Sequence, residues 1–135
     1  MIPTCILPLS DQLDPKNVRC IATGKSHSAV VGEDGDVYSW GRGWDGQLGH
    51  EVVTEIELEP RLVRSMEKLS CASIACGMAH TVAVTDTGNV WCWGDNKAGQ
   101  LGNGTLTSSS VPVPVAALQE MEVVQVCSRC VLDVC

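Results

Sequence analysis

The apolar positions of the chain fall into short runs that are separated by breaks containing glycine and acidic or polar residues. Two such runs flank each of two breaks, residues 33–35 (EDG) and 86–88 (DTG). Apolar runs rich in β-branched and aromatic residues on either side of an Asp-Gly type break are typical of β-hairpins. The pattern therefore predicts two hairpins, with strands over residues 28–31, 37–40, 81–84 and 90–93.

Each hairpin has a further apolar pair before it and a proline-containing segment after it. Residues 21–22 and 74–75 are both Ile-Ala and stand ahead of a glycine, so each predicts another strand. The segments around Pro60 and Pro112 lead out of each unit. We therefore expect each unit to form a small antiparallel sheet.

The two units are copies of one another. Residues 18–49 and 71–102 align without gaps at an offset of 53 and are identical at 13 of 32 positions. Pro60 and Pro112 also coincide once one loop residue is omitted, so the repeat period is 52 to 53 residues. A β-sheet unit with a period of this size predicts a propeller blade.

The repeat divides the chain into a lead-in segment, two full units and the start of a third. The third unit fails almost at once, because Arg129 and Leu132 stand where Gly77 and His80 should recur. We therefore expect an incomplete ring, as in a truncated isoform or in one part of a larger assembly. The predicted bounds are 1–17, 18–70, 71–122 and 123–135.

The residues shared by the copies form a recognisable pattern. Ile-Ala-x-Gly-x-x-His-(Ser/Thr) precedes an Asp-Gly or Thr-Gly break, and Trp-Gly-x4-Gly-Gln-Leu-Gly follows it in both copies. Over residues 18 to about 127 this pattern resembles the regulator of chromosome condensation repeat, and it lacks the paired glycines of kelch repeats. The resemblance implies an all-β fold of consecutive antiparallel four-stranded β-propeller blades, of which complete members hold about seven. The matching residues are Gly24, His27, Gly35, Trp40, Gly41, Gly46, Gln47, Leu48, Gly49, Gly77, His80, Gly88, Trp93, Gly94, Gly99, Gln100, Leu101 and Gly102.

We expect these repeated residues to build the scaffold. The glycines fall at predicted turns, where a positive φ or a close backbone approach is needed. The histidines recur without an acid or a nucleophile, which favours a hydrogen-bonded, half-buried role. The tryptophans are expected to anchor neighbouring blades, and the glutamines to satisfy backbone groups of the following loop.

Specificity is expected at the positions that differ inside this constant frame. These are residues 42–45 and 95–98, between Trp-Gly and Gly-Gln-Leu-Gly. An exposed Trp44 flanked by Arg42 and Asp45 is the leading candidate, because Trp and Arg are enriched in binding hot spots. The alternative is that Trp44 packs on its own loop. The predicted partner-binding residues are Arg42, Trp44, Asp45, Asp95, Asn96 and Lys97.

Composition and charge exclude several classes of function. Hydrophobic residues make up 44% and charged residues 19% of the chain, which is typical of a folded protein. The 9 basic and 16 acidic residues give a net charge of −7, so we expect no direct nucleic-acid binding. No apolar run has the roughly 18 to 20 residues of a membrane-spanning helix. Residues 1–9 contain two prolines and no basic flank, so no signal peptide is expected.

The eight cysteines raise the question of metal binding. Without a signal peptide, buried thiols in an intracellular protein, cytoplasmic or nuclear, are favoured over disulfides. Cys127, Cys130 and Cys135 could form half of a zinc site, but Cys71 and Cys76 lie in a predicted strand, where apolar residues are expected. Residues 41–46 match the Gly-x-Gly-x-x-Gly motif of dinucleotide-binding folds, but the second copy does not conserve the middle glycine of this motif. We expect neither a metal nor a cofactor.

No nucleophile elbow, phosphate-binding loop or metalloprotease helix is present in the sequence, so we expect no enzymatic activity. The leading hypothesis is a non-enzymatic protein-protein interaction module. The family resemblance implies an alternative, part of a guanine-nucleotide exchange factor for a Ran-like small GTPase. An isolated pair of blades would also leave two apolar outer faces bare, which predicts self-association.

Overall fold

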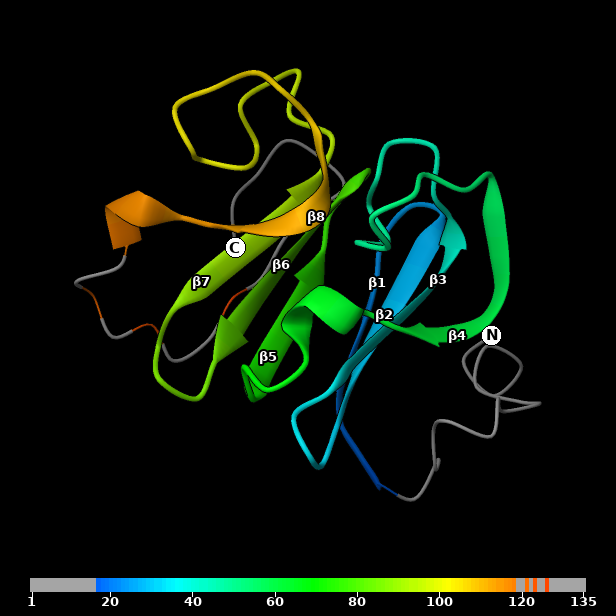
Figure 1. Ribbon diagram of the computed structural model, residues 1–135, viewed down its shortest axis with the longest axis vertical. Helices are drawn as coiled ribbons and strands as arrows, with labels where there is room; N and C mark the ends of the chain where they lie inside the picture. Colours follow the sequence, from blue (N-terminus) through cyan, green and yellow to red (C-terminus); the bar gives the residue numbers. More distant parts are fainter. Residues whose placement is uncertain (1–16, 119–120, 122, 124–125, 127–135) are drawn as a thin grey trace.

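The computed structural model describes residues 17–118, 121, 123 and 126. They form two four-stranded antiparallel sheets, with strand orders β1-β2-β3-β4 and β5-β6-β7-β8, which lie side by side in Figure 1. The all-β fold of consecutive four-stranded blades is therefore confirmed. The strands are β1 (Val18–Thr23), β2 (His27–Gly32), β3 (Val37–Arg42), β4 (Ile56–Leu62), β5 (Cys71–Cys76), β6 (His80–Thr85), β7 (Val90–Gly94) and β8 (Ser109–Pro114).

The central hairpin of each sheet turns at the predicted Asp-Gly or Thr-Gly break. Gly35 and Gly88 have φ values of 88° and 85°, a region that only glycine enters without strain. The amide of Gly35 donates to Gly32 O at 2.9 Å, and the amide of Gly88 donates to Thr85 O at 2.9 Å. These tight turns set the register of β2 on β3 and of β6 on β7.

The two sheets pack face to face, with β1 and β2 against β5. Short side chains of the first sheet, Ala29 and Val31 among them, meet Ile74, Ala83 and Trp93 of the second sheet in one buried cluster. Trp93 is fully buried there. A short 3-10 helix, η2 (Arg64–Met66), links β4 to β5 and adds Met66 to the same core.

The outer faces of the two sheets differ from the expectation of bare apolar surfaces. Trp40 and Tyr38 on the first sheet are only 7% and 6% exposed. On the second sheet, Val90 and Cys92 are buried, and Val123 is among the residues that pack against their cluster. These side chains of the two outer faces are therefore buried, while Ile21, Leu62, Val82 and Val113 beside them are only partly buried, and self-association stays a prediction.

Backbone hydrogen bonds join each repeat to the next in the same way. The amide of Cys71 donates to Gly35 O at 2.9 Å, and the amide of Val123 donates to Gly88 O at 3.3 Å. Val123 thus occupies the position at which a third copy was predicted to start. Its continuation, with Arg129 and Leu132, lies outside the described residues. None of the helices in the described residues has the length and apolar character needed to cross a membrane.

Candidate functional site

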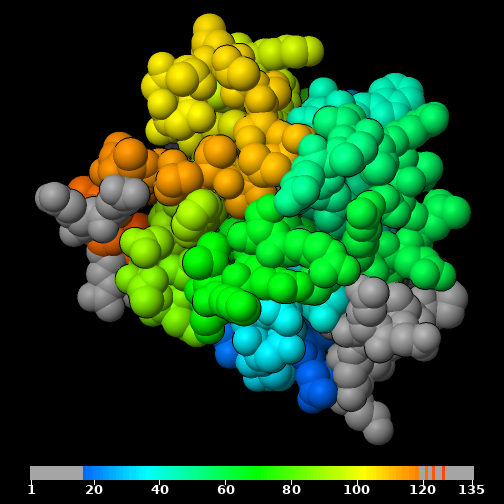
Figure 2. Space-filling view, in the orientation of Figure 1, coloured from blue at the N-terminus to red at the C-terminus, as the bar shows by residue number. Residues whose placement is uncertain are grey.

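The long loops of both sheets meet at one end of the molecule. The β3–β4 and β7–β8 loops lie at the top of Figure 1, together with the short β1–β2 and β5–β6 turns. In Figure 2 the teal and green atoms of the first long loop lie directly beside the yellow-orange atoms of β8. Ser110 Oγ, in β8, donates to Glu51 O at 3.0 Å and ties the two repeats together there.

An open groove of about 550 Å³ crosses this end between the two repeats. Four of the six predicted partner-binding residues line it: Arg42, Trp44, Asp45 and Asp95. The other lining residues are Lys25, Ser26, Gln47, Met78 and Ala79. The structure thus brings variable positions of both copies into one concave surface.

A second groove, of about 320 Å³, adjoins the first at the loop that carries Trp44. Lys97, the fifth predicted residue, lines it together with Val53 and Ser108. Trp44 and Asp45 line both grooves. The two grooves therefore meet at Trp44 and Asp45.

Trp44 is 59% exposed and its ring is held from one side. The guanidinium carbon of Arg42 lies 5.5 Å from the ring centroid, a cation-π geometry. The loop backbone is also fixed, because the amide of Asp45 donates to Gln47 Oε1 at 2.9 Å. The indole is thus ordered by its own loop and still presents more than half of its surface to solvent.

Asn96 does not lie on the surface as predicted. Its side chain is fully buried, and its amide donates to Thr105 O at 2.9 Å and to Thr107 O at 3.0 Å. Its Oδ1 accepts from the amide of Leu101 at 3.0 Å. Asn96 therefore folds the β7–β8 loop around itself, and we remove it from the candidate surface.

His27 lies buried beneath the grooves and joins the two repeats. Its Nε2 is 2.9 Å from Thr81 Oγ1, which donates its own proton to Gln47 O at 2.7 Å. The threonine must therefore accept from an Nε2–H, which leaves Nδ1 as the unprotonated nitrogen. Burial lowers the pKa of His27 to about 4, and nearby His80 contributes to the lowering. A ring with so low a pKa is a weak base, and its burial and its hydrogen bond to Thr81 give it a structural role.

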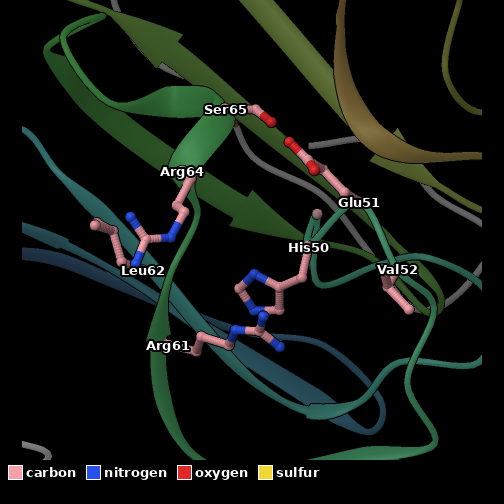
Figure 3. A pocket seen from close by; sticks show the side chains of 8 residues that line it. His50, Glu51, Val52, Arg61, Leu62, Arg64 and Ser65 are labelled. Carbon is pink, nitrogen blue, oxygen red and sulfur yellow. The ribbon is translucent and has the colours of Figure 1, made fainter.

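A small pocket of about 100 Å³ lies at the outer edge of the first sheet, shown in Figure 3. His50 lines it beside Arg61, and its Nε2 is 3.0 Å from Ser39 Oγ. Burial, and then the nearby Arg61, lower the pKa of His50. Because Ser39 Oγ donates to Leu48 O at 2.6 Å, it accepts from a neutral His50. The imidazole therefore anchors the β3–β4 loop to the sheet.

The structure gives no support for a metal site in the part of the chain that it describes. Across residues 17–118 and the three described positions beyond them, no three His, Cys, Asp or Glu side chains gather as ligands. Cys71 and Cys92 are buried thiols, and burial raises their pKa values to about 12 and about 11. Cys127, Cys130 and Cys135 lie outside the described residues.

Sequence reasoning missed the residues that the short turns contribute to the first groove. Lys25 and Ser26 come from the β1–β2 turn, and Met78 and Ala79 come from the β5–β6 turn. Both pairs stand between the constant glycine and histidine of the repeat and differ between the copies. The criterion used for the long loops, variation inside a constant frame, would have found them.

Comparisons with known proteins agree on the repeat. A family model described as the regulator of chromosome condensation (RCC1) repeat matches residues 34–84 and 87–128. A second model with the same description matches residues 18–47 and 71–100. The second pair of matches coincides with the aligned segments of the two internal copies.

Individual relatives share the repeat region and are much longer. Human E3 ubiquitin-protein ligase HERC2 is 40% identical over 130 residues, which are 95% of this chain and 3% of that protein. Mouse protein RCC2 is 42% identical over 99 residues, 72% of this chain and 19% of that protein. This chain thus spans less than a fifth of the length of either relative.

Solved structures show the same arrangement of blades. Prp20p from Saccharomyces cerevisiae, studied for its binding to Gsp1p and histones, superimposes with a TM-score of 0.79 at 25% identity, covering 91% of this chain and 31% of Prp20p. Yeast RCC1 (Prp20) bound to Kap60 gives a TM-score of 0.80 at 25% identity and covers 92% of this chain and 30% of that chain. Human WBSCR16 gives 0.67 at 28% identity, with 72% of this chain and 25% of that chain covered.

Proposed function

Because the chain belongs to the regulator of chromosome condensation (RCC1) repeat family, we propose that it is a non-enzymatic protein-binding module whose partner occupies the grooves around Trp44. The observation that carries the proposal is the convergence of variable side chains from both repeats on one exposed indole. Arg42, Asp45 and Asp95 line the same groove as Trp44. A family that holds its scaffold constant places its specificity in such loops.

The chemistry of the grooves suits a protein partner. Trp44 and Met78 are exposed apolar anchors, and Lys25 and Asp95 supply charges of opposite sign around them. An aromatic and apolar centre with a charged rim is the usual anatomy of a protein interface.

Guanine-nucleotide exchange on a Ran-like small GTPase is the second candidate. Its support is the structural similarity to Prp20p, which was studied for its binding to Gsp1p. This chain covers 31% of Prp20p, whereas exchange requires a surface wide enough to stabilise a nucleotide-free GTPase. An intracellular location and the repeat bounds 18–70 and 71–122 remain predictions.

Affinity capture from cell extract with quantitative mass spectrometry tests the binding proposal. The variant Trp44→Ala combined with Met78→Ala should lose the proteins that the wild-type chain retains. Leu106→Ser is the matched control, because Leu106 is exposed in the β7–β8 loop and lines neither groove. Identical capture by the double variant and the wild type would refute the proposed surface. Accelerated release of labelled GDP from a purified Ran-like GTPase would favour the second candidate.

A further inference from the structure

We propose that the partner segment bound beside Trp44 is amphipathic and basic, with apolar side chains interspersed with Lys or Arg. Its docking surface is the first-blade rim, defined here as Trp44, Val52, Val53, Ile56 and Leu58. The inference rests on the proposed function, because the rim begins at the same indole. It adds the chemical character of the partner and extends the site along β4.

The rim concentrates the exposed apolar side chains of the molecule. Eight large hydrophobic side chains are exposed among the described residues, and five of them are the rim. Their exposed fractions range from 52% at Val53 to 83% at Leu58. A cluster of this kind on a folded surface indicates an interaction site, whereas single exposed apolar residues do not.

Adjacent pairs connect four of the rim residues, and Val52, the chain neighbour of Val53, lines the pocket at the edge of the first sheet. Trp44 and Val53 line the same groove, and the Arg42 guanidinium stacks on the indole. Arg42 is the direct partner of Ile56 in the β3–β4 ladder, and directly opposed residues project on the same face. Leu58 follows Ile56 by two residues along β4. The rim therefore continues from the loop onto the edge strand.

The second repeat provides an internal control for this surface. In the first sheet Gly41 is the partner of Glu57, and in the second Gly94 is the partner of Ser109. This register places Ser108 and Ser110 at the positions of Ile56 and Leu58. The equivalent of Trp44 is Lys97 at the offset of 53. Ser110 there contacts the loop of the first repeat through Glu51 O, whereas no described repeat lies at the equivalent side of Leu58. The strand itself therefore accepts Lys, Ser and Ser at these positions, and the apolar side chains of the first repeat stand on the side that faces away from the second repeat.

Charge distinguishes the two loops as clearly as hydrophobicity. Residues 43–60 contain five carboxylates and are flanked by Arg42 and Arg61, whereas the equivalent residues 96–112 contain no carboxylate and one Lys. Glu57 is paired with Arg61 at 2.8 Å, and the described residues provide no ion pair for the other four. Electrostatic complementarity therefore favours a basic occupant. The carboxylates are Asp45, Glu51, Glu55, Glu57 and Glu59.

The rim is held in place before any partner arrives. The buried His50 fixes one end of the loop to Ser39, and the amide of Gly43 donates to Glu55 O at 3.2 Å. Glu51 is tied to Ser110 of the neighbouring sheet, as described above. A surface ordered in advance loses less conformational entropy on binding.

Side chains, rather than added backbone pairing, are expected to carry the binding. β4 is an edge strand, but Pro60 has no backbone N–H to donate to an added strand. In addition, the pairing register of β3 with β4 shifts between Ser39 and Gly41. Such features protect an edge from strand addition. A second copy of this chain, with its net charge of −7, would bring further negative charge to the carboxylates beside the rim.

Fluorescence anisotropy with labelled synthetic peptides tests the inference on the full 135-residue chain. The probe is a peptide of repeating Leu-Lys, and repeating Leu-Glu and Ser-Lys peptides of equal length are the controls. We expect only Leu-Lys to bind well. Raising the salt concentration from about 0.1 M to about 1 M, which shortens the Debye length from about 10 Å to about 3 Å, should weaken the binding.

Two variants separate the apolar and the electrostatic contributions. Ile56→Ser with Leu58→Ser installs the residues of the second repeat and should weaken Leu-Lys binding by about tenfold or more, because two apolar contacts are lost. Glu55→Gln with Glu59→Gln should weaken binding and flatten its salt dependence. Leu106→Ser should leave both unchanged.

Three results would overturn the inference. They are equal binding of the Leu-Glu or Ser-Lys peptide, unchanged binding by the Ile56/Leu58 variant, and a concentration-dependent dimer in sedimentation that this variant abolishes. The last result would assign the rim to a second copy. The proposed function is tested separately. If capture depends on Trp44 and Met78 but peptide binding is unchanged in the Ile56/Leu58 variant, the groove is supported and the rim is not. If capture is unchanged in the Trp44/Met78 variant, the proposed function fails.

Discussion

At the scale of single residues, His27 couples the stability of the molecule to pH. Its ring is buried between the repeats, and its Nε2–H donates to Thr81 Oγ1, a hydrogen bond that the neutral and the protonated ring can both make. Protonation would place a charge on a ring whose Nδ1 has no partner in the described part of the chain. Burial likewise lowers the pKa values of His50 and His80, so these histidines act in the same direction.

The sign of the pH dependence follows from the depressed pKa of His27. In the unfolded chain its pKa is near 6.5, and in the folded protein it is about 4. Between these values the unfolded state binds more protons, so the stabilisation is complete above about pH 6.5 and is lost as the pH falls toward 4. We expect His27 to contribute a loss of about 3 kcal/mol over that window.

Urea unfolding at several pH values between about 7.5 and about 4.5 measures this effect. The variant His27→Gln keeps a side chain that can donate to Thr81 and cannot be charged, so its unfolding free energy should depend less steeply on pH than that of the wild type. Parallel pH profiles for the two proteins would show that His27 does not titrate as described.

At the scale of the element, the end of β7 shows how closely the two repeats approach each other. Gly94 has a φ of 111°, and a Cβ there would lie 2.5 Å from Ala79 O and 3.2 Å from the Cα of Gln47. These neighbours are backbone atoms of the β5–β6 turn and of the first repeat's loop. Displacing them would cost free energy, because it would disturb both segments. The repeated Trp-Gly pair therefore ends the strand where a side chain would push the sheets apart.

Gly94→Ala should consequently destabilise the fold by more than about 2 kcal/mol, from backbone strain and steric overlap together. Gly104→Ala is the matched control, because Gly104 also has a positive φ, of 78°, but a Cβ there would meet no atom within 4 Å beyond its chain neighbours. Thermal unfolding of both variants separates the cost of backbone strain, which both share, from the cost of steric overlap, which only Gly94→Ala has. Equal losses at the two glycines would mean that the close approach at β7 contributes nothing.

The elements that the sequence predicted well are those encoded by local residues. Gly35 and Gly88 mark their turns because glycine adopts a positive φ without strain, whatever surrounds it. Once the strands of one copy are predicted, the repeat places the equivalent strands of the other. Asn96 was misplaced because its burial depends on the closure of residues 101–107 around it. Met78 was missed because variation between the copies was considered only in the long loops, and its place in one groove with Trp44 depends on the packing of the two sheets.

At the scale of the whole molecule, the two sheets share one core. Trp93 of β7 is fully buried in the cluster that also contains Ala29, Val31 and Val37 of the first sheet. The chain of hydrogen bonds from His27 through Thr81 to Gln47 crosses the same boundary. Neither sheet can separate without exposing this core, so we expect the pair to unfold as one cooperative unit.

Trp93→Ala tests that cooperativity. Truncating a fully buried tryptophan typically costs about 3 to 5 kcal/mol, and because the cavity opens between the sheets, the loss should reach both of them. Native-state hydrogen exchange should then show that amides of β2 lose protection by the same free energy as amides of β6, while Leu106→Ser leaves both unchanged. If only β5 to β8 lost protection, the two blades would be separate folding units. The grooves around Trp44 would then depend on an interface between the blades that can open while each sheet stays folded.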